Sequence, residues 1–452
     1  MTDIRADDPL RRVAKSERIV ALDVLRGVAI LLILVMNIPI MGGYAMVEPF
    51  DPRIVSWTPA DRAALVGVGM FLDGTQRGLL EVLFGAGVMI MTRRAMQPDG
   101  PVSVADLHFR RNLWLVAFGL IHAFVLLWPG DILFAYGIAA LFVFPFRRLA
   151  PTAKALVGAA FILAAVSPGV MRYAERVDLK ADVAAAEAKV KTGKATTAAE
   201  KETLEKWKEK VETAAPLAQN KKKQEAVAKE KKARLGPLPG YAQALAGIWA
   251  NFNVGPFLYF GFFEIFGTML LGMALYDWGV VQGRARTGVY VGMVVLGYGL
   301  GATARYFADM EYLRFNLEPK IGWMTWDIAR IGLVLGHIGL VNLALRTRPG
   351  ERLLSVFQAP GRMPLTIYFS ASILCMWILF PGMGFGLFGK YGQAGLTLIA
   401  LAIIAGQVVL ANAWMAAFES GPVDWLWKSL AYWKRQPFRK QPAGEEALAA
   451  AE

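Results

Sequence analysis

The sequence is poor in the residues that bind metals or form disulfides. It has one cysteine, Cys375, and three histidines, His108, His122 and His337, in 452 residues. One cysteine excludes a disulfide framework and a cysteine-based metal cluster. The wide spacing of the histidines argues against a histidine-rich metal site. We therefore expect neither disulfides nor a bound metal.

Charge is also scarce, and it is unevenly distributed. Charged residues make up 19% of the chain and hydrophobic residues 56%, against about 25% and 45–50% in soluble proteins. Residues 176–234 hold 26 of the 85 charged side chains. The rest of the chain has too little polar surface to face water. The net charge of +13 lies mostly in this block and beside apolar segments, as the positive-inside rule predicts, so we expect no nucleic-acid partner.

Apolar runs near the ~20 residues that cross a bilayer predict an all-α, polytopic membrane protein. We predict about ten spans, the second interrupted at 73–77 and the sixth at Gly255-Pro256. Their ranges are 20–40, 64–91, 112–128, 131–146, 153–170, 247–277, 288–304, 325–345, 363–381 and 394–416. The excess of Lys and Arg in alternate short loops places both termini in the cytoplasm.

This topology divides the chain into five parts. They are a cytoplasmic segment 1–18, membrane helices 19–175, a charged extracytoplasmic insertion 176–240, membrane helices 241–418 and a cytoplasmic interfacial tail 419–452. The insertion is rich in Ala, Lys and Glu, and Thr197-Ala-Ala-Glu200 predicts a helix start by a capping box. We expect a helical hairpin that ends near Pro216, followed by a Lys-rich helix. It acts either as a solvated spacer or as a docking surface for an anionic partner.

Ionisable groups inside spans are costly, so each one is a candidate functional residue. Asp23 and Arg26 share a helix face, either as a structural ion pair or with Arg26 facing a phosphate or carboxylate. His122 is a candidate general base, or a histidine bonded to a neighbouring helix. Helical rise places it about 10 Å deeper than Asp131, which begins the next span, so contact between them is not required.

Further polar residues lie within the predicted spans. Arg362, at the start of the ninth span, is expected to face the same cavity as Arg26. Glu264 stands alone in the sixth span, and spacing predicts a charge ladder from Asp73 through Arg77 to Glu81. Asn37 lies about three turns beyond Arg26 on a similar face, and His337, between glycines, is expected to be a packing residue rather than a catalyst.

Several motifs, in order along the chain, resemble the YeiB-like family of bacterial inner-membrane proteins, which carry domain of unknown function 418. They include residues 17–27 (ERIVALDVLRG), 119–136 (GLIHAFVLLWPGDILFAY), 361–368 (GRMPLTIY) and 421–432 (GPVDWLWKSLAY). This family is similar to the transmembrane acyltransferases, with which it shares the Leu-Asp-x-x-Arg-Gly opening. The resemblance implies that Arg26 helps to hold CoA and that His122 is the base. In the related heparan enzyme the catalytic histidine follows span one, where residues 41–63 here contain none.

The sequence therefore favours a membrane-bound acyltransferase of the bacterial inner membrane, with acyl-CoA as donor substrate. It would move an acyl group to a hydroxyl or amine of an envelope glycan, lipid or small metabolite. We expect this group to be acetyl. His122 and Asp131 are the candidate catalytic residues, and Asp23, Arg26 and Arg362 the candidate CoA-binding residues. The alternative is a transporter or flippase that uses the same charged residues without chemistry. Membrane lipid is an expected partner, and a homo-oligomer is one possible assembly.

Overall fold

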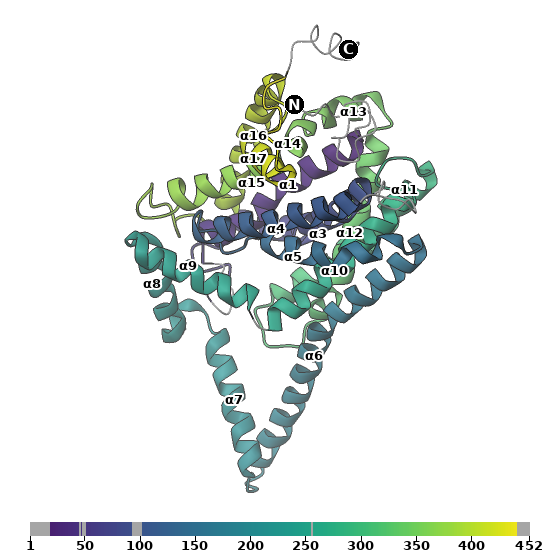
Figure 1. Cartoon of the computed structure of the whole chain (residues 1–452). Helices are drawn as coiled ribbons and strands as arrows, with labels where there is room; N and C mark the ends of the chain where they lie inside the picture. The colour runs from purple at the N-terminus through teal and green to yellow at the C-terminus, as the bar shows by residue number, and fades with distance from the viewer. Residues whose placement is uncertain (1–18, 45–46, 48–50, 93–101, 255, 441–452) are drawn as a thin grey trace, which may run out of the picture.

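The computed structural model describes residues 19–440 apart from 45–46, 48–50, 93–101 and 255, so the predicted cytoplasmic segment 1–18 lies outside the described residues. Regular structure in this described part is helical, as predicted, and forms one packed helical body with a long pointed projection (Figure 1). The projection leaves the body at the end opposite to α13 (Arg348–Ser355) and α17 (Pro422–Tyr432).

The first half of the chain folds into helices that overlap the predicted spans, although α4 begins ten residues earlier than predicted and α6 continues 21 residues further. They are α1 (Val20–Gly42), α2 (Pro59–Phe71), α3 (Thr75–Thr92), α4 (Val102–Phe124), α5 (Leu133–Val143) and α6 (Pro151–Lys191). The predicted break at 73–77 is confirmed, because α2 and α3 are separated by a turn at Gly74 with a φ of 68°. That positive φ favours glycine, and a Cβ there would lie 3.2 Å from the Arg330 side chain.

The second half continues the body with a further set of helices. They are α9 (Leu238–Asn253), α10 (Pro256–Asp277), α11 (Thr287–Tyr312), α12 (Gly322–Ala344), α13, α14 (Gln358–Arg362), α15 (Pro364–Ile373), a π-helical turn (Leu374–Leu379), α16 (Gln393–Ala417) and α17. The predicted sixth span is thus two helices, and it breaks where Gly255-Pro256 predicted. Proline cannot donate the backbone hydrogen bond that would continue α9 into α10.

Five of these helices are long and apolar enough to cross a membrane: α1, α6, α11, α12 and α16. Many apolar side chains on them face outward, such as Leu300 of α11 and Leu398 of α16, which are 71% and 67% exposed. A surface of this kind needs lipid rather than water around it. The protein is therefore a membrane protein. Each of the ten predicted ranges falls on helix, but the count of ten spans stays a prediction.

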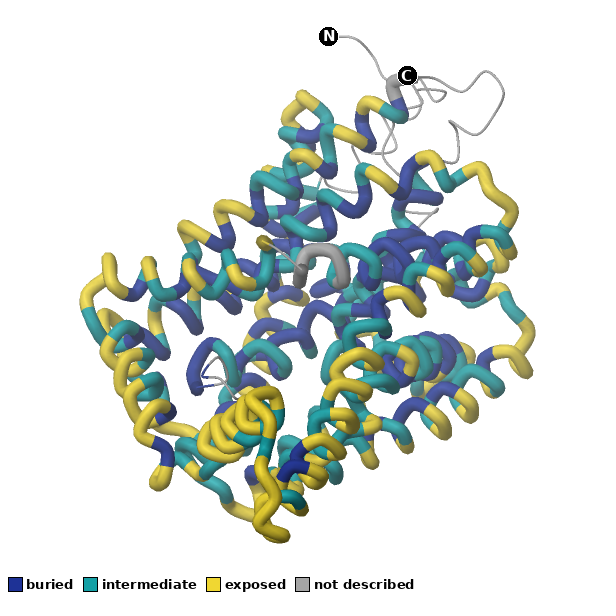
Figure 2. The backbone as a smooth tube through the Cα atoms, turned by 90° about the horizontal axis from the view of Figure 1, so that it is seen from below, coloured by how far each residue is buried: buried dark blue, intermediate teal, exposed yellow. Residues whose placement is uncertain are grey.

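The core is built around α1, which packs against α3, α14 and α16. Figure 2 shows the buried backbone concentrated in the body and the exposed backbone along the projection. The contact between α1 and α14 is a backbone contact made by two glycines. A Cβ on Gly27 would lie 1.9 Å from the Phe357 carbonyl oxygen, and one on Gly361 would lie 1.8 Å from that of Asp23. This contact brings Asp23, Arg26 and Arg362 to one place.

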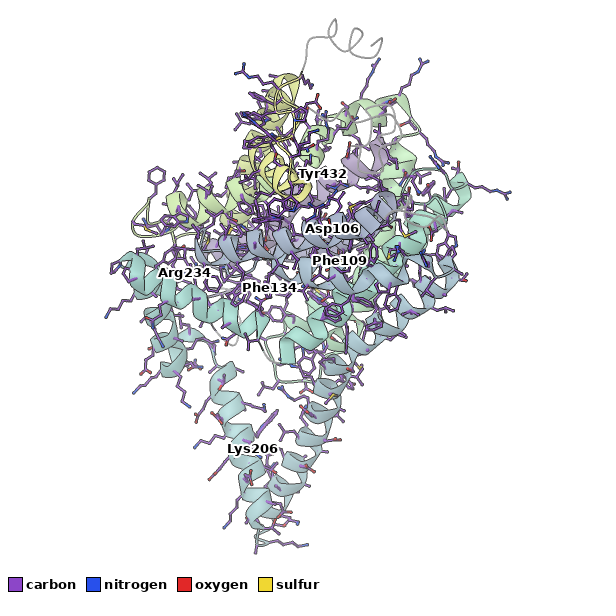
Figure 3. The ribbon with its side chains drawn as sticks, viewed as in Figure 1. Asp106, Phe109, Phe134, Lys206, Arg234 and Tyr432 are labelled. Carbon is purple, nitrogen blue, oxygen red and sulfur yellow. The ribbon has the colours of Figure 1, made fainter. Side chains whose placement is uncertain are left out.

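The projection is the predicted charged insertion. A single helix, α6, continues from the membrane helices through the predicted boundary at 175/176 to Lys191 and meets α7 (Ala198–Ala214) at the tip, where Lys189 contacts Glu200. The capping box of Thr197 and Glu200 is confirmed, as are the end of α7 before Pro216 and the Lys-rich α8 (Lys221–Leu235). The two arms diverge toward the body, with Lys206 on α7 far from Tyr432 on α17 (Figures 1 and 3).

The end of the insertion is fixed to the body by buried ionic contacts. Arg234, at the end of α8, donates to the Ile40 carbonyl (2.9 Å), and Lys223 donates to Asp51 (3.2 Å), which also accepts from Arg53 (2.8 Å). Burial raises the pKa of Asp51, but the hydrogen bonds from Arg53 and Lys223 outweigh it and hold the pKa below its ordinary value. Asp51 is therefore charged at neutral pH and links α8 to the loop after α1.

Replacing Asp51 by asparagine is expected to speed amide exchange of α8 about tenfold or more at pH 7, since a charge-assisted hydrogen bond contributes roughly 1.5–3 kcal/mol. Because the folded pKa is lowered, the contribution is present above the unfolded value of about 3.9 and is lost as pH falls through the lower folded value. Normalised exchange of residues 221–235 is thus expected to be constant from pH 8 to 5 and faster below about pH 4. Glu225→Gln, exposed on α8, is the matched control. Equal exchange in Asp51→Asn and Glu225→Gln would contradict this link.

Candidate functional site

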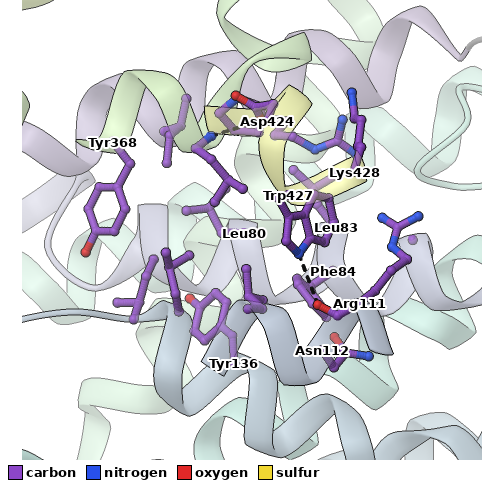
Figure 4. Close-up of a pocket in the computed structure, with 18 of the residues that line it drawn as sticks. Leu80, Leu83, Phe84, Arg111, Asn112, Tyr136, Tyr368, Asp424, Trp427 and Lys428 are labelled. Carbon is purple, nitrogen blue, oxygen red and sulfur yellow. Dashed lines mark hydrogen bonds between the residues drawn. The ribbon is translucent and has the colours of Figure 1, made fainter. Parts of the chain in front are cut away.

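A cavity of about 270 Å³ lies where α1, α3, α4, α5, α14, α15 and α17 meet (Figure 4). Its wall is mainly apolar and includes Leu83 and Phe84 of α3, Leu115 of α4 and Leu133 of α5. A largely apolar cavity with a few convergent polar groups is the usual form of a small-molecule site.

Four cationic side chains line this cavity: Arg26 of α1, Arg111 of α4, Arg362 of α14 and Lys428 of α17. The structure therefore places Arg26 and Arg362 in one cavity, as the sequence predicted. Arg26 Nη1 donates to Asp23 Oδ1 (3.2 Å) and to the Gly361 carbonyl (3.3 Å). The structural ion pair and the cavity-facing arginine, posed as alternatives from the sequence, thus occur together.

The tail helix α17 closes one side of the cavity. Trp427 donates to the Arg111 carbonyl (3.0 Å), and the Arg111 guanidinium lies 4.6 Å from the Trp427 ring centre (Figure 4). Asp424, the acidic residue of the lining, accepts from the backbone N–H groups of Leu365 (3.2 Å) and Thr366 (3.0 Å). The Asp424 carboxylate therefore caps the free backbone N–H groups at the first turn of α15. The cavity keeps an excess of positive charge, which suits a phosphorylated ligand.

The histidine predicted as a base is not among the residues that line the cavity, but it lies next to Tyr368, which does line it. His122 is fully buried, and its ring centre lies 4.5 Å from that of Tyr368 and 4.6 Å from that of Phe369. Tyr368 itself lines the cavity and accepts a hydrogen bond from the Trp128 indole (2.9 Å). Tyr368 thus contacts both the cavity and His122.

His122 and Asp131 are in contact, contrary to the depth calculated from helical rise. His122 Nδ1 lies 2.8 Å from Asp131 Oδ1, and both side chains are fully buried. The calculation was wrong because α4 ends at Phe124. The chain then turns back through Leu127, with a φ of 59°, and the Trp128 N–H donates to the His122 carbonyl. Because of this turn, Asp131 lies beside the imidazole of His122.

A second polar cluster lies between α3, α10 and α12. Glu81 is fully buried and accepts from Arg330 Nη1 (3.0 Å), while Arg77 Nε lies 3.8 Å from it. Glu264, predicted to be alone, instead bonds Arg77 and lies 3.2 Å from Arg330. A sequence cannot show which distant helix supplies a partner, and here α3 and α12 each supply an arginine.

The predicted charge ladder is only partly present. Arg77 and Glu81 form an ion pair, as the ladder predicts. Asp73 instead pairs with Arg305 of α11 at 3.8 Å. His337 bonds the Leu333 carbonyl (2.8 Å) and lies 3.3 Å from the Tyr298 hydroxyl, an environment typical of a packing histidine. Asn37 is half-buried on α1 and is not among the residues that line the cavity.

Sequence reasoning missed several of the residues that form the site. The sequence predicts Trp427 and Lys428 in an interfacial tail, because aromatic and basic residues after a last span usually serve as an anchor. Asn112 is only the first residue of the third predicted span, and Arg111 only one of the cations predicted on its cytoplasmic side. Their positions in the cavity follow from the packing of α17 on α4, which joins residues more than 300 positions apart.

The C-terminal part of the chain matches a known family. A family model described as a protein of unknown function (DUF418) matches residues 275–434, from the end of α10 through α17. No solved structure matches the chain.

The similar proteins span nearly the whole chain. The uncharacterized protein YxaH of Bacillus subtilis (strain 168) is 28% identical, with 94% of this chain and 97% of YxaH covered. The uncharacterized protein YeiB of Escherichia coli (strain K12) is 26% identical, with 92% and 96% covered. The chain is thus similar to YeiB and YxaH over nearly its whole length, and its C-terminal part matches the family described as a protein of unknown function (DUF418).

Proposed function

We propose that this protein is a membrane-bound acyltransferase that takes an acyl group from cytoplasmic acyl-CoA and passes it to an acceptor. We expect the acyl group to be acetyl. The acceptor would be a hydroxyl or amine of an envelope glycan, a lipid or a small metabolite. The observation that carries the proposal is the hydrogen bond between His122 Nδ1 and Asp131 Oδ1, buried just behind a cation-lined cavity. An oriented base near a cation-lined cavity supports acyl transfer from a CoA thioester.

The cavity supplies the binding part of the reaction. Arg26, Arg111, Arg362 and Lys428 give the positive charge that the phosphates of CoA need, and arginine binds phosphate oxygens in a bidentate manner. The apolar wall formed by Leu83, Phe84 and Leu115 suits the uncharged arm of the donor. In this arrangement the thioester points toward Tyr368 and the histidine behind it.

The buried pair supplies the base. When His122 Nδ1–H donates to Asp131, the other ring nitrogen, Nε2, carries the lone pair that takes a proton. As a nucleophilic oxygen or nitrogen attacks the thioester carbonyl carbon, its proton passes to Nε2. The carbon–sulfur bond then breaks, and CoA leaves as the thiol with that proton. Asp131 stabilises the imidazolium formed in between.

The proposed setting is the bacterial inner membrane with both termini in the cytoplasm. The positive-inside rule supports this orientation, and Arg26, Arg111 and Arg362 then face the compartment that contains acyl-CoA. The insertion formed by the outer part of α6, α7 and α8 would lie on the other side, since it leaves the body at the end opposite to α17 (Figure 1).

Binding of acetyl-CoA and of CoA to the purified protein in nanodiscs tests the donor. Arg26→Ala and Arg362→Ala are each expected to weaken binding about tenfold or more, which is about 1.4 kcal/mol. Arg352→Ala is the matched control, since Arg352 is exposed on α13 and does not line the cavity. Absence of binding to well-folded wild-type protein would show that the donor is wrong.

A transporter is the second candidate, and the buried cluster of Arg77, Glu81, Glu264 and Arg330 favours it. Buried carboxylates between helices are common in proton-coupled carriers, and the break between α2 and α3 resembles the interrupted helices of transporter sites. If no CoA species binds, proton and solute flux in proteoliposomes becomes the deciding measurement, with Glu264→Gln as the variant expected to abolish coupling.

A further inference from the structure

The buried histidine has a partner on each of its ring nitrogens. Nδ1 lies 2.8 Å from Asp131 Oδ1, and Nε2 lies 2.8 Å from the hydroxyl oxygen of Ser372 on α15. The three side chains thus form a hydrogen-bonded line of serine, histidine and aspartate. Ser372, like His122, is fully buried.

This environment is unusual for a serine in a helix. A helical serine commonly bonds a carbonyl one turn earlier, as Ser370 does with the Ile367 carbonyl at 2.9 Å. The Ser372 hydroxyl instead bonds an imidazole whose other nitrogen lies against a carboxylate, and it is the donor when His122 Nδ1 carries the proton. A nucleophile within hydrogen-bond reach of a base, with a third group orienting that base, is the general arrangement that activates a serine.

The position of Ser372 relates it to the cavity. Leu115 of α4 and Leu365 of α15 line the cavity, and His122 and Ser372 each follow seven residues later on the same helices. Seven residues are two turns, so both lie on the cavity-facing side and about 10 Å further along. Tyr368, one turn before Ser372, lines the cavity, and its ring centre lies 4.5 Å from that of His122.

The helix changes form next to the serine. The π-helical turn Leu374–Leu379 begins two residues after Ser372 and continues α15. Turns of this type are rare and occur frequently at functional sites, because an added residue redirects the side chains that precede and follow it. This is a second observation, independent of the hydrogen bonds, at the same place in the fold.

We propose that Ser372 is the nucleophile of the transfer and carries the acyl group as an ester between donor and acceptor; this rests on the proposed acyltransferase function. Ser372 Oγ attacks the thioester carbonyl carbon while its proton passes to His122 Nε2. The carbon–sulfur bond breaks, and CoA leaves as the thiol with that proton. The acceptor hydroxyl or amine then attacks the ester and gives its proton to Nε2. The bond from the acyl carbon to Oγ breaks, and Ser372 regains a proton from His122.

The ester separates the two half-reactions in time, so donor and acceptor need not be bound together. CoA is then released in the absence of any acceptor, in an amount equal to the amount of protein. A direct transfer from donor to acceptor gives no such release.

The experiment mixes protein in nanodiscs with radiolabelled acetyl-CoA and no acceptor. Wild type is expected to release one CoA per chain and to yield a hydroxylamine-sensitive acetyl ester on the peptide that contains Ser372. Ser372→Ala abolishes both, while Ser370→Ala, two residues away on α15, leaves both unchanged. His122→Ala slows labelling about 10²-fold or more. Ser372→Cys, which keeps a nucleophile of similar size, is expected to form a thioester and shows that loss in the alanine variant does not reflect misfolding.

A fluorophosphonate probe tests the same serine without assuming the donor. It is expected to modify Ser372 in wild type and to fail in His122→Ala. An adduct without acetyl-CoA binding means that the serine is a nucleophile and that the proposed donor is wrong. Acetyl transfer that persists in Ser372→Ala, or the absence of both ester and adduct in active wild type, overturns the proposal and leaves the acyltransferase function standing.

Discussion

Asp131→Asn is expected to lower kcat for acyl transfer about 10³–10⁴-fold and to leave KM for acetyl-CoA nearly unchanged. An amide N–H in place of Oδ1 donates to His122 Nδ1, so the proton moves to Nε2 and the base is lost. The other carboxylate oxygen, Oδ2, accepts from the Phe134 N–H at 2.8 Å, and the amide oxygen can keep that bond. The fold is therefore retained while the tautomer is wrong, which makes Asp131 a positioning residue.

Initial rates against acetyl-CoA concentration, measured in nanodiscs from pH 5 to 9, check this. A change confined to kcat, together with loss of the rising limb of the pH profile, separates a wrong tautomer from a general loss of structure. Asp106→Asn is the matched control, because Asp106 lies on the same helix as His122 but is exposed. A variant with wild-type kcat, or one whose KM rises as much as its kcat falls, would contradict the assigned role.

Arg330→Met is expected to destabilise the folded protein by about 3–5 kcal/mol, the usual cost of removing one partner from a buried ion pair. Arg330 is fully buried and lies 3.0 Å from Glu81, 3.2 Å from Glu264 and 3.6 Å from Asp327. Without it, Arg77 alone remains to compensate Glu81 and Glu264. Adding Glu81→Gln to Arg330→Met removes one of those charges and is expected to restore part of the loss.

Denaturant unfolding of the purified protein in detergent micelles measures this difference. Arg314→Met is the matched control, since Arg314 is exposed beyond the end of α11 and a surface substitution changes stability by about 0.5 kcal/mol or less. Equal stability of Arg330→Met and Arg314→Met would show that water or relaxation already compensates the carboxylates.

Local features of this fold could be read from the sequence, because they depend on neighbouring residues. The break at Gly74, the end of α9 before Pro256 and the capping box at Thr197 each follow from the conformational preference of one or two residues. The excess of apolar residues over charged ones was enough to predict a membrane protein.

The candidate site depends on contacts between distant segments, and these could not be read. The partner of Glu264 depends on how α3, α10 and α12 pack, and the role of Trp427 depends on where α17 lies. Ser372 had no sequence signal, since a lone serine in an apolar helix is common. The contact of His122 with Asp131 was missed because rise arithmetic treats a helix as continuing, whereas the turn at Leu127 reverses the chain.

Helix α6 connects the insertion directly to the apolar helices of the body, because it continues without interruption from one into the other. Its 41 residues span about 61 Å at 1.5 Å per residue, roughly twice the thickness of the hydrocarbon core. The outer half therefore acts as a lever of about 30 Å, and a 10° change in tilt at the membrane moves the tip by about 5 Å. Because α8 is anchored to the loop at Asp51, such a tilt also changes the opening between the two arms. A small change in the tilt of α6 would therefore appear as a larger displacement at the tip of the projection.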